Sequence, residues 1–255
     1  MITVSGVPPW VDAERLLGPG PWKQVAGDWV TELGAGAEAD VQARLRGVVL
    51  GGRAITVELD PPAPRALVRA ARLRDARARR RTTPGFTKGA ARLDEEGRLS
   101  LTPEALAVAI GERATGRDVV DATCGCGGNA IGFARAGCAV VAVDVSAERL
   151  ELARHNARLY GVADRISFVC ADAREVVPNL ATDLVFVDPP WSAPDLDPLR
   201  ALAGVVRTEL WAKVPPAFDP AGLPDAVAEA WFGQAGGDRH RVKLLLLKRP
   251  RLRER

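Results

Sequence analysis

The sequence predicts an α/β fold whose centre is a mostly parallel sheet. Two short apolar runs, Val119–Asp121 and Ala139–Asp144, each end in an aspartate, and a glycine-rich loop and a helical stretch lie between them. A strand, a glycine turn, a helix and a second strand within about thirty residues are typical of a β-α-β unit. A third apolar run at Ile166–Cys170 and a fourth that ends at Asp188 continue the pattern. We therefore expect further parallel strands.

The glycine loop predicts a site for a nucleoside. Gly125 and Gly127 follow a strand directly, and without a Cβ they let the backbone turn tightly and approach a ligand. Asn129 is placed to cap or hold the helix that follows. Asp144 ends the second strand, where a carboxylate can accept hydrogen bonds from two ribose hydroxyls. Asp172 follows the third strand, where we expect contacts to an adenine edge.

Two features favour S-adenosylmethionine as the cofactor over a dinucleotide. The spacing Gly125-x-Gly127-x-x-Ala130 also fits the fingerprint of nicotinamide and flavin enzymes, so the loop alone leaves both open. Asp121, directly before the loop, is placed to meet an amino group on the tail of a cofactor. The motif DPPW at 188–191 closes the fourth strand. A dehydrogenase needs neither feature.

The DPPW motif predicts chemistry on an exocyclic amine of a nucleobase. Pro189 and Pro190 fix φ and remove two backbone donors, so the turn is stiff and its carbonyls are free to accept hydrogen bonds. Asp188 and the carbonyl of Pro189 can accept both hydrogens of an amine whose lone pair is delocalised into the ring. Trp191 offers a flat face for the base. The alternative is a rigid turn with a core tryptophan.

Four stretches of the chain resemble the trimethylguanosine synthase family, the RNA cap guanine-N2 methyltransferases: residues 93–110, 121–137, 153–172 and 183–195. The loop CGCGGN and the run NARLYG are the most specific parts of a likeness that extends from about residue 86 to the C-terminus. The resemblance implies a class I, Rossmann-like methyltransferase with a seven-stranded, mostly parallel sheet, S-adenosylmethionine as donor and guanosine N2 as acceptor. The implied cofactor-binding residues are Ser100, Leu101, Thr102, Asp121, Cys124, Gly125, Gly127, Asn129, Asp144, Val145, Asp172 and Ala173, and the implied catalytic residues are Asp188, Pro189 and Trp191.

The chain departs from the family in its DPPW motif. The family usually has Ser-Pro-Pro-Trp-Gly-Gly, whereas Asp188 begins the motif here and Ser192 and Ala193 end it. An aromatic residue is also expected near position 98. The Asp form is more typical of enzymes that act on amines of unmethylated bases, so an internal guanosine or adenosine of rRNA or tRNA is as good a substrate as a cap. Heavy use of Ala, Arg, Gly and Pro indicates a GC-rich, bacterial genome.

We expect three parts in the chain: residues 1–62, an arginine-rich helical connector at 63–84 and a methyltransferase domain at 85–255. The order of elements in the first part, βαββαβ, predicts a small ferredoxin-like α+β domain. Its residues 39–62 are similar to the second half of an RNA recognition motif. The first-strand position of the usual stacking aromatic holds Thr3, and the third strand offers Trp29 alone. The domain therefore binds RNA, or it packs on the catalytic domain or mediates dimerisation.

The last part of the chain predicts the remaining elements of the catalytic sheet. We expect a fifth strand at Thr208–Val214 and a seventh at Val242–Lys248, the seventh in an antiparallel hairpin with a weakly marked sixth strand near Trp231. A helix is expected at Ala221–Ala228.

Two basic segments predict RNA as the partner. Residues 65–81 carry eight arginines and one aspartate, and Arg65, Arg69 and Arg72 fall on one helical face. Residues 239–255 carry eight Lys or Arg and one Glu. A solvated helix face usually explains a charge run, but these runs are one-sided, and like charges repel unless a polyanion neutralises them.

Composition excludes several classes of protein. Four cysteines, two of them in the glycine loop, do not form a disulfide framework, and a reducing cytoplasm is expected. A metal site at Cys124-x-Cys126 is rejected because the chain has two histidines and no second cysteine pair. No long apolar run or signal segment is present, which predicts a cytoplasmic protein without membrane contact. Two alternatives to RNA methylation remain: an enzyme that methylates a DNA base or a small aromatic amine, and a non-catalytic RNA-binding protein that keeps the fold.

Overall fold

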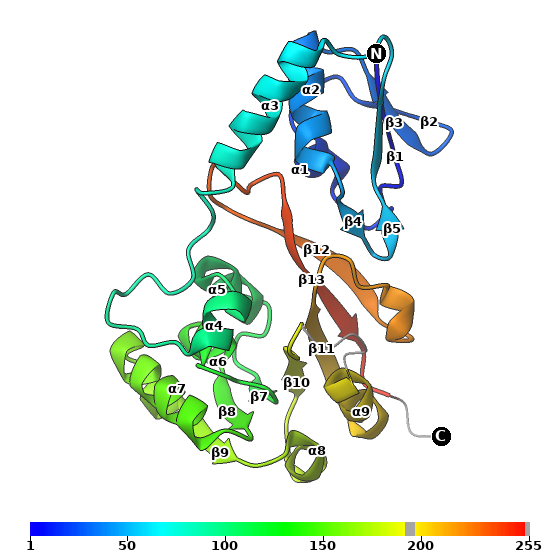
Figure 1. Ribbon diagram of the computed structural model, residues 1–255. Helices are drawn as coiled ribbons and strands as arrows, with labels where there is room; N and C mark the ends of the chain where they lie inside the picture. Colours follow the sequence, from blue (N-terminus) through cyan, green and yellow to red (C-terminus); the bar gives the residue numbers. More distant parts are fainter. Residues whose placement is uncertain (192–196, 253–255) are drawn as a thin grey trace. The chain divides into compact units, whose positions relative to one another are not determined.

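The computed structural model describes residues 1–191 and 197–252, so Ser192 and Ala193 of the predicted motif and the end of the basic tail lie outside the described residues (Figure 1). The chain divides into two compact units. Among the described residues, no helix is both long and apolar enough to cross a bilayer. The N-terminal unit comprises Met1–Thr83, Pro215–Gly222 and Ala228–Leu245, and the C-terminal unit comprises Pro84–Val214, Leu223–Val227 and the residues from Leu246 onward.

A seven-stranded sheet forms the centre of the predicted α/β fold, with the strand order β12-β13-β11-β10-β7-β8-β9. Its strands are β7 (Asp118–Asp121), β8 (Ala139–Asp144), β9 (Ile166–Cys170), β10 (Leu184–Val187), β11 (Glu209–Val214), β12 (Val227–Phe232) and β13 (Val242–Arg249). The five strands from β7 to β11 pair in parallel, which confirms the predicted mostly parallel sheet. The chain order reverses between β7 and β10, the kind of switch point where open α/β sheets bind ligands.

The strands form where the sequence is continuously apolar. All four residues of β10 are buried, as expected for a central strand with both faces covered. Phe133 of α6 packs edge-on against Phe186 of β10, with ring centroids 5.1 Å apart. The helices are α4 (Glu95–Ser100), α5 (Glu104–Glu112), α6 (Gly128–Arg135), α7 (Ala147–Tyr160), α8 (Ala173–Val176) and α9 (Asp197–Val205), with 3₁₀ turns at Ala163–Arg165, Val177–Asn179 and Pro220–Gly222.

The helix expected at Ala221–Ala228 is wrong. A 3₁₀ turn at Pro220–Gly222 is followed by β12, which begins at Val227. Pro224 cannot donate to a helical ladder, and Asp225 has a φ of 63°, which a right-handed helix does not accommodate. β12 is the weakly marked strand expected near Trp231, and most of its residues are only half-buried.

The N-terminal unit contains an antiparallel sheet with the order β2-β3-β1-β6. The chain runs in the expected order, with a short additional hairpin, β4–β5, before the last strand. Its elements are β1 (Ile2–Ser5), α1 (Ala13–Leu17), β2 (Lys23–Val25), β3 (Asp28–Thr31), α2 (Ala35–Leu45), β4 (Val49–Leu50), β5 (Arg53–Ala54), β6 (Thr56–Leu59) and α3 (Arg65–Ala78). The resemblance of this unit to an RNA recognition motif stays a prediction.

The sheet of the N-terminal unit presents no aromatic stacking platform from Trp29. Trp29 pairs with the fully buried Val4 and packs against the core of the unit. The other face carries Thr3, whose neighbours on the adjacent strands are Val30 and Glu58. Helix α3 packs on α2 through a small cluster of alanines. The segment expected to be a connector is thus part of the N-terminal unit.

Candidate active site

A cavity of about 420 Å³ opens at the carboxyl ends of β7, β8, β9 and β10. This volume lies in the range of small-molecule sites, and the position is that of ligand sites in open parallel sheets. Most of the predicted site residues line it: Ser100, Leu101, Thr102, Cys124, Gly125, Asn129, Asp144, Val145, Asp172, Ala173, Asp188 and Pro189. Asp121, Gly127 and Trp191 do not line the cavity.

The glycines of the loop have different roles. Gly125 has a φ of 50°, and a Cβ there would meet no atom within 4 Å, so its backbone faces open space in the cavity wall. Gly127 has a φ of 89°, and its Cβ would lie 3.1 Å from the Cβ of Ala153 on α7. Gly127 therefore permits helix packing, whereas Gly125 permits close approach of a ligand.

Asp144 is fixed at the end of β8 by two backbone groups. Its Oδ2 accepts a hydrogen bond from the N–H of Gly125 at 2.9 Å, and its Oδ1 accepts one from the N–H of Ser146 at 2.9 Å. The next residue, Val145, is 72% exposed and lines the cavity with its apolar side chain. At the end of β9, the side chain of Arg174 pairs with Asp172 and lowers the pKa of that carboxyl to about 2.

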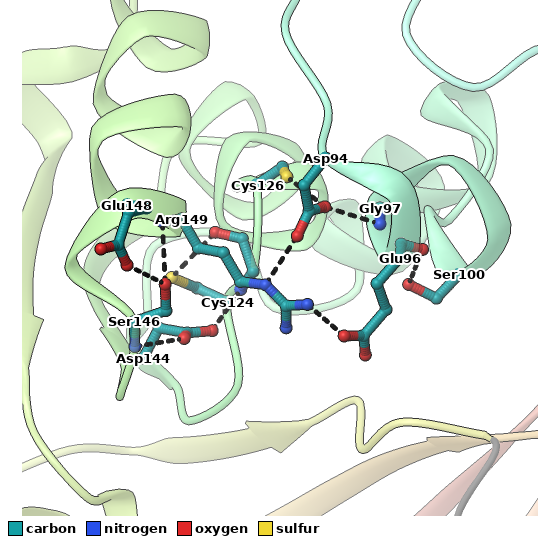
Figure 2. A network of polar contacts seen from close by, with 11 residues as sticks. Asp94, Glu96, Gly97, Ser100, Cys124, Cys126, Asp144, Ser146, Glu148 and Arg149 are labelled. Carbon is teal, nitrogen blue, oxygen red and sulfur yellow. Dashed lines mark hydrogen bonds and ion pairs between the residues drawn. The ribbon is translucent and has the colours of Figure 1, made fainter.

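An ion-pair network joins the segment before α5 to helix α7 (Figure 2). Nε of Arg149 donates to Oδ2 of Asp94 at 2.8 Å, and the same guanidinium pairs with Glu96. Asp94 also caps α4 through the N–H of Gly97, at 2.7 Å, and accepts from the thiol of Cys126. The pairing fastens α4 beside the glycine loop, and the residues that follow α4 form one wall of the cavity.

Asp188 lies between two donors at the end of β10. Its Oδ2 accepts hydrogen bonds from Nζ of Lys213 at 2.7 Å and from Nδ2 of Asn129 at 2.9 Å. Its backbone N–H donates to the hydroxyl of Thr123 at 2.8 Å. The other oxygen, Oδ1, is buried without a hydrogen-bond partner among the described residues. Burial raises the pKa of Asp188, and the ammonium of Lys213 opposes that shift.

Asn129 does not cap helix α6, contrary to our expectation. Gly127 occupies the N-cap position without a side-chain hydrogen bond, and the amide of Asn129 reaches Asp188 instead. The side chain of Asn129 is buried, so its amide needs a hydrogen-bond partner inside the protein, and the carboxylate of Asp188 is within reach.

Lys213 is the residue that sequence reasoning missed. It lies on β11, its side chain is 2% exposed, and it also donates to the carbonyl of Ser100 at 2.8 Å. Its ammonium sits 4.8 Å from the ring centroid of Trp191, so that indole packs on the cation. A lysine in the apolar strand ELWAKV is the signal that points to it, since a buried ammonium requires a partner.

Asp121 is fully buried, and no side-chain donor among the described residues reaches its carboxylate, whereas the backbone N–H groups of Thr123 and Ala130 lie near enough to oppose the effect of burial on its pKa. Burial and the nearby charge of Asp188 raise the pKa of Asp121 to about 8. Arg149, Asp94 and Glu96 were not predicted as site residues, because their pairing joins segments that are more than fifty residues apart in the chain.

Comparison with known proteins agrees with this geometry. Residues 116–198 match the family model for RNA cap guanine-N2 methyltransferases. Trimethylguanosine synthase of Schizosaccharomyces pombe is 36% identical over 112 residues, which are 40% of this chain and 46% of that protein. An uncharacterized RNA methyltransferase of Gloeobacter violaceus is 38% identical over 100 residues, 39% of this chain and 22% of that protein. The chain thus spans less than half the length of these curated relatives.

Solved structures give weaker likenesses. TrmN from Thermus thermophilus is 24% identical with a TM-score of 0.46, over 62% of this chain and 52% of that one. An RNA methyltransferase from Salinibacter ruber, in complex with S-adenosyl-L-homocysteine, is 18% identical with a TM-score of 0.44, over 60% and 95% of the two chains. The matched family and the curated relatives are methyltransferases, which agrees with the predicted methyltransferase domain.

Proposed function

We propose that the C-terminal unit methylates an exocyclic amine of a nucleobase in RNA, preferably N2 of guanosine, with S-adenosylmethionine as the methyl donor. The observation that carries the proposal is the half-satisfied carboxylate of Asp188. One of its oxygens is held by Lys213 and Asn129, and the other is buried beside the cavity with no partner. Such an acceptor is the group that an amine hydrogen needs.

The residues present fit the proposed donor. Besides Asp188, the described residues of the cavity wall with unpartnered buried polar atoms are Thr102 and Asn129, and Asn129 contributes an acceptor oxygen. Acceptors suit a ligand that carries amino groups, such as this cofactor with its amino-acid tail and adenine. Asp144 would hold the ribose, and the exposed Val145 would pack against the adenine ring. When bound, S-adenosylmethionine supplies an electrophilic methyl group on a sulfonium.

The residues at the end of β10 would activate the amine by orientation. Oδ1 of Asp188 and the carbonyl of Pro189 accept the two amine hydrogens, which draws the nitrogen toward tetrahedral geometry and frees its lone pair. Lys213 favours the ionised form of Asp188, which is the form that accepts from both sides. The proton leaves the amine after methyl transfer, so no strong base is required.

Trp191 has a different place from the one that we expected. Its ring packs on Lys213 outside the cavity wall, and its indole N–H is buried without a partner among the described residues. Stacking of the base on this indole, as proposed from the sequence, would require a change of its rotamer. In the arrangement described, Trp191 positions the lysine that holds Asp188.

Helix α3 supports RNA as the substrate class. Arg65, Arg69 and Arg72 line an open groove on one face of α3, and no ion pair engages them within residues 1–191 and 197–252. Arg74 and Arg79, by contrast, pair with aspartates of the same unit. The proposed RNA-binding face of Arg65–Arg81 is therefore narrower than the sequence indicates.

The basic tail contributes less to this proposal. Arg249 is buried and donates to the carbonyls of Ala203 and Val206, and Lys248 lies over the ring of Trp211. These cations hold the C-terminal unit together. Residues 253–255, which complete the tail, lie outside the described residues.

The test combines a nucleoside analysis with one variant. RNA from a deletion strain and its parent, digested to nucleosides, should differ by one methylated guanosine in mass spectrometry. Asp188→Ala should lower turnover about 10²–10³-fold, as expected for loss of one oriented hydrogen-bonding group, while calorimetry shows unchanged affinity for S-adenosylmethionine. An active, folded Asp188→Ala variant would contradict the assigned role. Failure to bind S-adenosylmethionine would favour the alternative of a non-catalytic RNA-binding protein.

A further inference from the structure

The N-terminal unit contains a second polar cavity, of about 210 Å³, between α2, α3 and the segment before β13. Four arginines line it: Arg44 from α2, Arg74 from α3, and Arg239 and Arg241 from the segment before β13. His240 and two carboxylates, Asp40 and Asp75, complete the polar lining. Four guanidinium groups thus face two carboxylates, so the wall carries an excess of positive charge.

Both carboxylates of this cavity are already engaged. Oδ1 of Asp40 accepts two hydrogen bonds from Arg74, at 2.8 and 3.0 Å. Asp75 pairs with Arg79, at 2.9 Å, and with Arg241. Neither aspartate is left to neutralise the remaining arginines.

The two remaining arginines have only neutral partners among the described residues. Arg44 donates to the carbonyls of Leu16 and Leu17, the latter at 2.6 Å, and its Nε is buried without a partner. Burial and the neighbouring charge of Arg241 lower the pKa of Arg44 to about 10. Arg239 is exposed and donates to Nε2 of His240, at 3.1 Å.

His240 is neutral in this arrangement. Its Nε2 accepts from Arg239, and its Nδ1 lies 2.6 Å from the carbonyl oxygen of Arg15, so the proton is on Nδ1. Burial and the surrounding arginines lower the pKa of His240. The wall therefore has a surplus of cationic donors and no anion to match them.

We propose that this cavity binds a phosphate of the RNA backbone. Guanidinium groups bind phosphate through paired hydrogen bonds, and the small volume suits one phosphate better than a base with its sugar. The inference rests on the proposed function in taking RNA as the substrate. It places a phosphate contact in the N-terminal unit, whose sheet has a threonine at position 3 and packs the ring of Trp29 against the core, so neither position offers a ring for base stacking.

NMR of the imidazoles tests the proposal, because the chain has two histidines, His155 and His240. A bound phosphate should raise the pKa of His240, since an anion favours the charged imidazolium. His155 lies on α7 of the C-terminal unit, with Nε2 at 3.0 Å from the carbonyl of Ala90, and serves as the internal control. Inorganic phosphate and a short RNA oligonucleotide are the two probes. We expect both to move His240, and a response to inorganic phosphate without one to saturating RNA would overturn the proposal.

A matched pair of variants completes the test. Arg239→Gln should abolish the response of His240 and reduce the slope of log K against log salt for RNA by about 1. Arg165→Gln removes the same charge from an exposed position in the 3₁₀ turn directly before β9 and should leave the slope unchanged. An unchanged slope in Arg239→Gln, with the fold verified by circular dichroism, would refute the phosphate site. RNA methylation is measured separately, on the wild type and on both variants. If the wild type does not methylate RNA but its His240 still responds to the probes, the proposed function is overturned and the phosphate site stands.

Discussion

Replacement of Lys213 by methionine tests the electrostatic design of the site. The ammonium is 2% exposed and lies 2.7 Å from a carboxylate that is 10% exposed, so the pair is almost free of solvent screening. Removing one member of such a pair leaves an uncompensated buried charge, which costs about 3–5 kcal/mol of folding stability. Methionine keeps the apolar length of the side chain, so the loss is one of charge and hydrogen bonds to Asp188 and Ser100.

Urea unfolding of four proteins measures the pair: wild type, Lys213→Met, Asp188→Asn and the double variant. Each single variant should unfold at lower urea, and the double variant should be more stable than the sum of the two losses predicts, by about 2–3 kcal/mol. Lys23→Met, at an exposed position on β2, is the control and should change stability by less than about 0.5 kcal/mol. Additive losses in the cycle would refute the reasoning.

The same variant should change the pH dependence of turnover. Without the ammonium, burial raises the pKa of Asp188 further, so the ionised acceptor forms only at higher pH. The acid limb of the activity profile of Lys213→Met should therefore move to higher pH. Lys213→Arg should restore part of the wild-type profile, because a guanidinium retains the charge. An acid limb at the wild-type position in Lys213→Met would show that Asp188 does not titrate under the control of this lysine.

Three further predictions concern other parts of the molecule. The folded chain holds a proton on Asp121 between about pH 4 and pH 8, which the unfolded chain has released, so this group makes stability fall as pH rises through that window. Asp121→Asn should remove that slope, and parallel urea midpoints from pH 5 to pH 8 for the two proteins would contradict it. Arg149→Met should weaken S-adenosylmethionine binding about 3–10-fold in calorimetry, because its pairs with Asp94 and Glu96 are partly exposed and contribute modestly; an unchanged affinity would show that α4 keeps its place without them. Replacing Arg65, Arg69 and Arg72 with Gln should reduce the salt slope of RNA binding by about 2–3, whereas the same change at Arg165 should not.

The fold could be predicted largely because parallel strands buried on both faces are continuous apolar runs. The strands that end at Asp121, Asp144 and Val187 follow this pattern, and their carboxyl ends meet at one edge of the sheet. Residues at those ends could therefore be assigned to a common site without knowledge of any side-chain contact. β12, which begins at Val227, is only half-buried and lacks a continuous apolar run, so the local pattern predicted a helix there instead.

The contacts within the site could not be predicted in the same way. Lys213 and Asp188 come from adjacent strands, and Arg149 and Asp94 come from segments 55 residues apart, so no local spacing brings either pair together. The sequence also does not show which way a side chain points: Asn129 donates to Asp188 instead of capping α6, and Asp121 is buried and does not line the cavity. The direction of a buried polar side chain depends on which donors and acceptors lie around it in the folded chain.

Lys213 gives a physical reason for the aspartate that begins the DPPW motif. A serine at position 188, as in the usual form of the related family, would leave the buried ammonium of Lys213 with the carbonyl of Ser100 and the face of Trp191 as its partners. A buried cation without a counter-charge is strongly unfavourable, so the identities of residues 188 and 213 are coupled. Under the proposed function the coupling also sets the direction of hydrogen bonding, because an ionised carboxylate whose Oδ2 is held by Lys213 and Asn129 keeps Oδ1 as an acceptor for the amine. A serine hydroxyl, which can also donate, would not impose that direction on an incoming amine.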